Sequence, residues 1–319
     1  MKKRVSIAAG LAISAVLLWL ASRRVDFSAL ADILAHVKPA PLILVIFTVL
    51  SELVIRGVKW RLLLVPSGQV RAWDALRFET IGLALNNVLP LRLGEIARGT
   101  FAANFFKINI IAVFSTILAE KASDMAALCI LSSAAAVVSG ISMGVSRRGL
   151  FPISMTIALV VLCVILKRGR FLVRLEKSPQ IKRTLNGLVF GLKAFNSPGS
   201  AAAISLLALL QWFMNALNYY WLALAFSVEN TVTLAKSVLL SFTGAAASSA
   251  PGMPGYFGNF ELAVSTVIAG WGISKETSLA YSVAAHLLSY LIITTVGLFF
   301  AYQMGQSLER IWTKFSEKK

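Results

Sequence analysis

Several ionisable side chains of this sequence lie inside long apolar runs, where an unpaired charge is costly in a lipid environment. Glu52, Arg56 and Lys59 follow one another at intervals of four and three residues, so on a helix they share one face and can pair with each other. Glu120 and Asp124 are one helical turn apart in a later run and need a cationic partner, which Lys121, Arg92 or Arg56 could supply. Charges at membrane depth usually face a bundle interior or a water-filled cavity. These residues therefore predict a polar site, with snorkelling of the bases at a helix end as the alternative.

A stretch at 248–261, SSAPGMPGYFGNFE, interrupts another apolar run with two prolines, three glycines and the carboxylate Glu261. Proline removes an amide donor and glycine loosens the backbone, so a helix is expected to break here. In hydrocarbon, broken backbone is tolerated only where it is buried in protein or lines a wet cavity. We therefore expect a half-helix that begins near Gly255 and turns its positive N-terminal end toward an anion.

The N-terminal half contains a matching interruption at 83–98, LALNNVLPLRLGEIAR. Arg92, Glu95 and Arg98 are three residues apart and would form one stripe on a helix that begins after the proline. An arginine in this stripe could fork onto a phosphate, or the stripe could be a self-neutralising structural ion pair. Paired interruptions in two halves are typical of transporters built from inverted repeats, with the site between the repeats; two unrelated kinks are the alternative.

Other polar residues recur in otherwise uncharged runs. Gln211, Asn215 and Asn218 have helical spacing, which favours hydrogen bonds between helices over a cavity-lining role. His286 and Tyr290 lie one turn apart, and a lone membrane histidine more often satisfies a packing hydrogen bond than it relays protons. We therefore leave these residues outside the candidate site.

The elements that hold the polar residues are expected to be membrane helices. The chain has 319 residues, of which 57% are hydrophobic and 14% charged, and its mean hydropathy is +0.76. A soluble core of this size needs far less apolar sequence. At about 20 residues per crossing, the apolar runs give a baseline of seven spans, near 5–22, 40–64, 108–140, 149–166, 198–227, 234–250 and 277–304. The prediction is an all-α integral membrane protein with about seven to eight transmembrane helices, two broken or re-entrant segments and an inverted repeat.

Basic residues predict the domains and the topology. Between Lys167 and Lys193 the chain has eight bases and one acid, so this linker is expected in the cytoplasm, as is the N-terminus. The net charge of +17 is interpreted as a sign of orientation and of contact with anionic head groups, not of nucleic-acid binding. The predicted domains are an N-terminal membrane half at 1–166 with the interrupted segment 83–98, a basic cytoplasmic linker at 167–197, and a C-terminal membrane half at 198–319 with the interrupted segment 248–271.

Four motifs occur in an order that resembles a known family. They are Arg56 with Trp60, NNVLPLRLGEIAR at 86–98, Glu120-Lys121 with Asp124, and PGMPGYFGNFE at 251–261. Over nearly the whole chain they resemble the lysylphosphatidylglycerol synthase transmembrane region, a flippase-like family of uncharacterised bacterial and archaeal membrane proteins. The resemblance implies an all-helical membrane domain that moves, or helps to move, a lipid with a large polar head group. The aminoacyl-transferase domain that the synthases carry after this region does not follow here, so aminoacylation is not expected.

The expected function is a flippase-like lipid translocase of the cell inner membrane, in which the polar head group of a phosphate-bearing lipid passes between the two broken segments. An intramembrane enzyme on a lipid-linked substrate is one alternative, although the sequence contains no GxSxG, HExxH or Walker motif. A non-transporting lipid-binding accessory subunit is another. The expected partners are an anionic phospholipid or polyprenyl phosphate, with a lipid-modifying synthase left open, and no cofactor, metal or nucleic acid is expected. The candidate head-group site comprises Arg56, Asn86, Arg92, Glu95, Arg98, Glu120, Asp124, Gly255 and Glu261.

Overall fold

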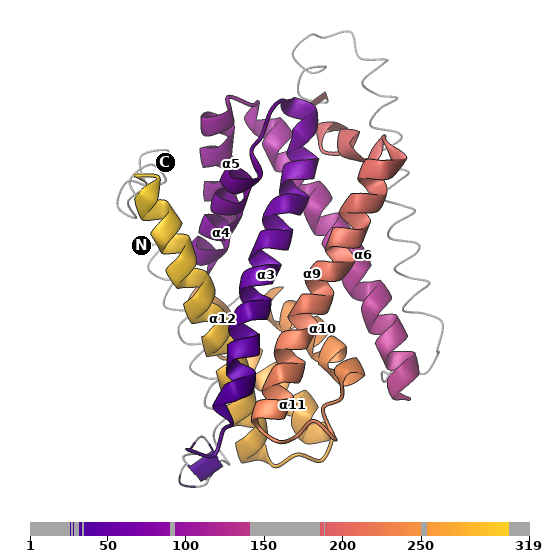
Figure 1. Cartoon of the computed structure of the whole chain (residues 1–319), viewed down its shortest axis with the longest axis vertical. Coiled ribbons are helices and arrows are strands. Elements are labelled where there is room, and N and C mark those ends of the chain that lie inside the picture. Colours follow the sequence, from indigo (N-terminus) through magenta and orange to yellow (C-terminus); the bar gives the residue numbers. More distant parts are fainter. Residues whose placement is uncertain are drawn as a thin grey trace, which may run out of the picture. The chain divides into compact units, whose positions relative to one another are not determined.

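The computed structural model describes residues 26, 28, 32, 33, 35–89, 93–140, 186, 187, 189–249 and 254–305. These residues form helices, and no strand occurs among them (Figure 1). The α-helices are α3 (Pro39–Leu64), α4 (Ala72–Val88), α5 (Leu93–Phe106), α6 (Ile110–Ser139), α9 (Pro198–Ala225), α10 (Leu234–Ser249), α11 (Asn259–Gly270) and α12 (Lys275–Gln303). The short 3₁₀ helices are η1 (Val65–Ser67), η3 (Lys193–Phe195) and η4 (Pro254–Tyr256). The predicted spans near 5–22 and 149–166, most of the basic linker and Arg92 lie outside the described residues.

Four of the described helices, α3, α6, α9 and α12, are long and apolar enough to cross a membrane. Their 26 to 30 residues exceed the length needed for a hydrocarbon core of about 30 Å. Large apolar side chains remain exposed along them, as at Phe47 and Val137, which suits contact with lipid. The chain is therefore an all-α membrane protein, as the sequence predicts.

The run near 234–250 differs from the prediction of a full span. It forms α10, which has 16 residues and is about 24 Å long. The following α11 has 12 residues and is about 18 Å long, so neither helix alone matches the thickness of the hydrocarbon core. The helix breaks that the prolines and glycines predict account for these short lengths.

Both predicted breaks are present as helix ends. In the N-terminal half, α4 ends at Val88 and α5 begins at Leu93. In the C-terminal half, η4 lies between α10 and α11, and Gly255 and Gly258 have φ angles of 74° and 89°. Positive φ angles are readily adopted by glycine, because it has no Cβ to clash with the backbone. The glycines of this stretch therefore permit the turn that separates the two helices.

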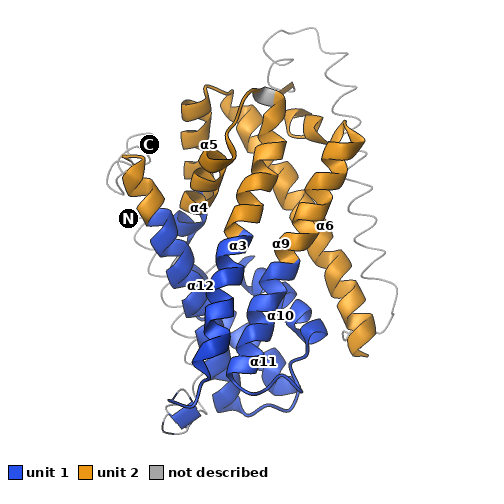
Figure 2. Cartoon of the chain, in the orientation of Figure 1, with its two compact units in different colours: residues 1–52, 83–94, 213–298 blue, residues 53–82, 95–212, 299–319 orange. Residues whose placement is uncertain are grey.

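The chain divides into two compact units, which are described separately below (Figure 2). Unit 1 comprises residues 1–52, 83–94 and 213–298, and unit 2 comprises residues 53–82, 95–212 and 299–319. The unit boundaries fall inside α3, α4, α5, α9 and α12, so these helices contribute residues to both. The units are groups of residues in spatial contact, whereas the predicted halves and linker are segments of sequence. The division into two halves and a linker therefore stays a prediction.

Each unit has its own buried packing. In unit 1, residues of α3, α9, α10, α11 and α12 share one hydrophobic core that includes Val45, Leu222 and Val264. In unit 2, α3 and α4 approach closely at Gly57, where an added Cβ would lie 2.6 Å from the Cα of Leu76. This close packing holds the polar residues of α3 and α4 in fixed positions relative to each other.

Candidate functional site

Unit 2 contains a cluster of buried ionisable side chains, called here the charged cluster. Its members come from four helices: Lys59 on α3, Glu79 on α4, Arg98 on α5, and Glu120 and Asp124 on α6. Each of these side chains is at most 7% exposed. Charges are almost never buried unless they are paired, and here each one has an oppositely charged neighbour.

Arg98 is held on three sides. One terminal nitrogen pairs with Glu79, and the other donates to Glu120 Oε2 at 2.9 Å. The guanidinium carbon lies 4.5 Å from the centroid of the Trp60 ring, and Trp60 Nε1 donates to Thr116 Oγ1 at 3.2 Å. The flat guanidinium therefore bridges two carboxylates while it stacks on an indole whose orientation is fixed, a use of arginine that lysine cannot reproduce.

Lys59 is the base next to the two acids of α6, Glu120 and Asp124. Its ammonium group pairs with Asp124, donates to Gln211 Oε1, and lies 3.8 Å from Glu120 Oε1. Glu120 thus lies between the two bases, with one oxygen facing Lys59 and the other facing Arg98. The charged cluster is one connected network.

The charges of this network balance. Arg56 is close enough to act electrostatically on Lys59 and Glu120. With Arg56 included, the network contains three bases and three acids, and its formal charge is zero when all six are ionised. The bases are Arg56, Lys59 and Arg98, and the acids are Glu79, Glu120 and Asp124. A balanced network of this kind is suited to recognising a group that carries its own charges, and not to attracting a bare cation as a ring of acids would.

At the charged cluster, carboxylate oxygens of Glu79 and Glu120 and two donors, one of Arg98 and one of Gln211, lack a hydrogen-bond partner in the part of the chain that the structure describes. The two donor atoms are Arg98 Nε and Gln211 Nε2, and neither has a hydrogen-bond partner among the described residues. A buried polar group without a partner costs roughly 1–3 kcal/mol, and such exceptions are uncommon in native proteins. Both donors would be satisfied by the oxygen atoms of an anion.

Unit 1 contains a second buried polar pair, Glu261 on α11 and His286 on α12. Glu261 Oε1 and His286 Nδ1 are 2.5 Å apart, and the two residues are only 2% and 7% exposed. Glu261 Oε2 accepts a hydrogen bond of 2.6 Å from the backbone N–H of Gly258. One carboxylate thus caps its own helix and binds a neighbouring helix.

This geometry corrects the expectation of a half-helix that begins near Gly255 with its N-terminal end open to an anion. The helix α11 begins at Asn259, with Gly258 as its N-cap, and the carboxylate of Glu261 occupies the N-terminal position itself. A glutamate three residues after an N-cap is a known capping pattern, so the GNFE sequence contained a signal for this arrangement.

Other polar residues of the membrane helices form hydrogen bonds between helices in unit 1. Asn215 Nδ2 donates to Glu52 Oε2 at 3.2 Å, and Thr48 donates to Asn218. These bonds join α3 to α9, in agreement with the interhelical role expected for the asparagines of this run. They are consistent with leaving these residues outside the candidate site.

The structure places the nine predicted site residues in different surroundings. Arg98, Glu120 and Asp124 lie together in the charged cluster, and Arg56 lies near it. Glu95 pairs with Lys121 at 3.0 Å, and both side chains of this pair are about a third exposed.

The remaining predicted residues are not in the charged cluster. Asn86, Gly255 and Glu261 belong to unit 1, where Asn86 is buried and its Oδ1 has no partner among the described residues. Arg92 lies outside the described residues.

The site prediction omitted four residues that take part in these polar contacts. Lys59 and Glu79 belong to the charged cluster, Gln211 accepts a hydrogen bond from Lys59, and His286 is the partner of Glu261. Each is a polar residue in an apolar helix, and a polar residue in such a position by itself indicates a candidate site.

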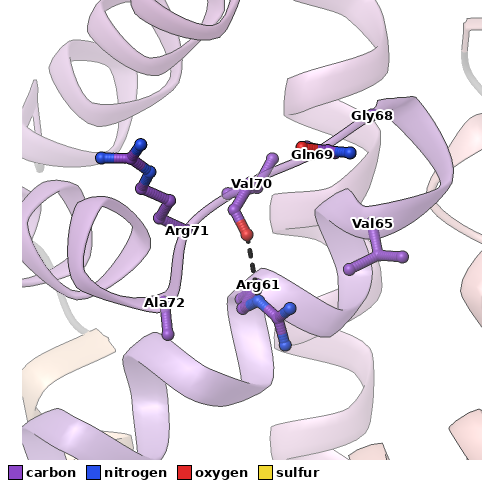
Figure 3. Close-up of a pocket in the computed structure, with 7 residues that line it drawn as sticks. All are labelled: Arg61, Val65, Gly68, Gln69, Val70, Arg71 and Ala72. Carbon is purple, nitrogen blue, oxygen red and sulfur yellow. Dashed lines mark hydrogen bonds between the residues drawn. The ribbon is translucent and has the colours of Figure 1, made fainter.

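The loop between α3 and α4 contains an open hollow of about 710 Å³ (Figure 3). It is lined by Arg61, Val65, Gly68, Gln69, Val70, Arg71 and Ala72. Arg61 Nε donates to Val70 O at 3.0 Å, and the side chain of Arg71 extends away from Arg61. The hollow shares no residue with the charged cluster, so we do not include it in the candidate site.

Comparisons with known proteins agree with the sequence patterns. The family described as the lysylphosphatidylglycerol synthase TM region matches residues 7–297 of this chain. A UPF0104 membrane protein of Methanothermobacter thermautotrophicus is 21% identical over 271 residues, which are 79% of this chain and 80% of that protein. The family match includes both units' polar residues and both helix breaks.

Proposed function

Because the chain belongs to the lysylphosphatidylglycerol synthase transmembrane region family, we propose that it is a translocase of a polar-headed, phosphate-bearing lipid in the cell inner membrane. The acyl or prenyl tails stay in hydrocarbon while the head group passes through polar protein. The lipid is an anionic phospholipid or a polyprenyl phosphate, and the protein itself makes and breaks no covalent bond.

The observation that carries this proposal is the charged cluster with its two unused donors. Five ionisable side chains buried in a membrane protein are expensive, and such residues usually mark a substrate or ion pathway. Arg98 Nε and Gln211 Nε2 add donors without acceptors. A phosphate group supplies several strong acceptor oxygens and a negative charge, which together suit these donors.

In the described conformation, the terminal nitrogens of Arg98 are occupied by Glu79 and Glu120. We infer that a head-group phosphate exchanges with one of these carboxylates on the guanidinium fork. Lys59, which lies 3.8 Å from Glu120, would then receive the released carboxylate. The bases thus remain paired when the substrate is bound and when it is absent, which keeps the cost of burial low.

An enzyme acting on a lipid-linked substrate is the competing function. Catalysis by nucleophilic attack requires a nucleophile activated by an adjacent base. The charged cluster instead consists of bases and acids that pair with each other, an arrangement that favours recognition of charge over formation of a covalent bond.

The test is head-group translocation in liposomes that contain the purified protein, with a panel of labelled phospholipids and polyprenyl phosphates. Arg98→Lys is expected to lose most of the activity, because an ammonium group cannot reproduce the bidentate fork. Arg77→Lys is a matched control, since Arg77 also stacks on a tryptophan, Trp73, and pairs with an acid, Asp74, but its side chain is 25% exposed.

Two results would contradict the proposal. One is wild-type protein that moves no lipid of the panel faster than protein-free liposomes do. The other is Arg98→Lys protein that is present at a normal level and has full activity, which would leave the charged cluster as a structural network only.

A further inference from the structure

We propose that the hollow between α3 and α4 binds the phosphate of an anionic lipid head group at the membrane surface (Figure 3). The hollow shares no residue with the charged cluster, and binding of a lipid there requires no translocation. Lipid binding in the hollow is therefore independent of the proposed translocase activity.

Two bases line the hollow, and no acid is among the described residues that line it. The bases are Arg61, in the last turn of α3, and Arg71, which directly precedes α4. Neither base is part of an ion pair within the part of the chain that the structure describes. Asp74, the acid in the first turn of α4, pairs with Arg77 at 3.8 Å. The hollow therefore has two positive charges that an anionic ligand can neutralise.

The loop itself orients Arg61. Its Nε donates to the backbone oxygen of Val70 at 3.0 Å, which leaves the two terminal nitrogens of the guanidinium group for another acceptor. These two nitrogens can bind two oxygens of one phosphate. Figure 3 shows the bond to Val70, and it shows that the side chain of Arg71 extends away from Arg61. Arg61 would therefore supply the hydrogen bonds, while Arg71 adds a second positive charge at the hollow.

The hollow lies at the end of a helix that is long and apolar enough to cross a membrane. The helix α3 has 26 residues and is about 39 Å long, more than the hydrocarbon thickness of about 30 Å. All of its bases lie in its second half, so this end is the one expected among the head groups. Trp73, beside the hollow, is 51% exposed, and tryptophan is enriched at membrane interfaces. We therefore expect the hollow at the depth of the lipid phosphates.

The apolar part of the hollow favours a lipid over free phosphate. Val65 lines the hollow and is 45% exposed, and Ala72, which also lines it, is exposed as well. The volume of about 710 Å³ lies in the range of sites for small organic molecules, about 300–1,000 Å³. A phosphate group alone would leave most of this space unused. The glycerol part of a lipid can contact Val65 and Ala72 while the phosphate binds Arg61.

A contact between two 3₁₀ helices indicates which leaflet supplies the lipid. The helix η1, which follows α3, packs against η3, at the end of the basic linker. The hollow therefore lies on the same side of the membrane as this end of the linker. If the linker is cytoplasmic, as the sequence predicts, the hollow faces the cytoplasmic leaflet, whose surface is negatively charged.

The test is photo-cross-linking of the full-length protein in nanodiscs of phosphatidylcholine. The probe is a small fraction of a phosphatidylglycerol analogue with a photoreactive diazirine beside its head group. After digestion with pepsin, mass spectrometry identifies the labelled peptides. We expect labelling of the peptide that contains residues 65–72. A matched probe with a phosphatidylcholine head group is expected to label this peptide at least about fivefold less, because each base near the surface favours an anionic lipid by about this factor.

Substitution of the two bases tests the site directly. Arg71→Gln is expected to lower the labelling about fivefold, and the double variant Arg61→Gln with Arg71→Gln about 25-fold. Because Arg71 does not make the bond to Val70, its single variant removes a charge and keeps that bond. The matched control is Lys107→Gln with Lys275→Gln, which removes two exposed bases outside the hollow. This control is expected to keep the wild-type labelling.

Three results would overturn the proposal. One is equal labelling of the peptide by the two probes, and another is unchanged labelling in the double arginine variant. The third is labelling that an excess of inorganic phosphate abolishes, which would show a site for free phosphate.

The cross-linking experiment and the translocation assay can fail separately. Labelling is assigned peptide by peptide, so a failure at the hollow leaves the charged cluster and the translocase proposal untouched. In the same way, a protein that moves no lipid in liposomes can still be labelled at the hollow.

Discussion

Removal of the Arg98 side chain tests how the charged cluster is held together. Arg98→Met keeps a long unbranched side chain of similar reach but removes the base that pairs with Glu79, and it leaves Glu120 with Lys59 at 3.8 Å. Three buried carboxylates, those of Glu79, Glu120 and Asp124, would then remain with two bases, Lys59 and the nearby Arg56. We expect the variant to be much less stable than the wild type.

The size of the loss follows from the contacts. Breaking a buried ion pair by removing one partner typically costs about 3–5 kcal/mol, because the remaining charge is left without compensation. The lost stacking of Arg98 on Trp60 adds roughly 0.5–2 kcal/mol. The ammonium group of Lys59 offsets a part of this cost, so the expected decrease in the free energy of unfolding is about 3–5 kcal/mol.

The rescue experiment separates charge from packing. Adding Glu79→Gln and Glu120→Gln to Arg98→Met removes the unpaired charges while it preserves side-chain size. Neutral replacement of a buried ion pair is often harmless to stability, so the triple variant is expected to recover most of the loss. Unfolding by denaturant in lipid bicelles, followed by tryptophan fluorescence, measures both variants against the wild type.

The same variants decide between a structural and a functional role. If Arg98 binds the head group, the triple variant folds but moves no lipid. A decrease below about 1 kcal/mol in Arg98→Met, or a triple variant no more stable than the single one, would refute the electrostatic reasoning.

Two further predictions concern packing and topology. Gly57→Ala is expected to lower the free energy of unfolding by about 1–3 kcal/mol, because its Cβ would lie 2.6 Å from the Cα of Leu76. Gly270→Ala is the control, because no atom lies within 4 Å of the added Cβ there. Equal stability of the two variants would contradict the close approach of α3 and α4. Ser178 belongs to the predicted basic cytoplasmic linker and lies outside the described residues. We expect a cysteine in a Ser178→Cys variant not to react with an impermeant thiol reagent applied to intact cells. Labelling of this cysteine from outside would show that the predicted topology is wrong.

The sequence predicted the long helices well, because hydrophobic length is a local property. The apolar run near 40–64 becomes α3 at Pro39–Leu64, and the run near 198–227 becomes α9 at Pro198–Ala225. The break after Val88 was also predictable, since proline and glycine act on the backbone wherever they occur.

The partners of the buried charges could not be predicted in the same way. The spacing of Lys59 with Glu52 and Arg56 identified a polar helix face, but the acids that bind Lys59 are on α6, as far as 65 positions away at Asp124. Helical periodicity determines which residues share a face, whereas tertiary packing determines what that face meets.

The site prediction omitted Glu79, a member of the charged cluster, for the same reason. It has no motif around it, and its role depends on Arg98, which approaches from another helix. The start of α11 was placed near Gly255 because proline and glycine dominated the interpretation, although the position of Glu261 relative to Gly258 already indicated the cap.

The pairing of Lys59 with Glu120 and Asp124 also has a consequence for biosynthesis. The helix α3 leaves the ribosome well before α6, and the ammonium group of Lys59 on α3 pairs with acids that lie on α6. A lone Asp near the middle of an inserting helix, the position of Asp124 in α6, costs about 2.5–3.5 kcal/mol on the translocon scale. Because Lys59 of α3 has been synthesised by then, we expect its pairing with Asp124 to lower the cost of inserting α6.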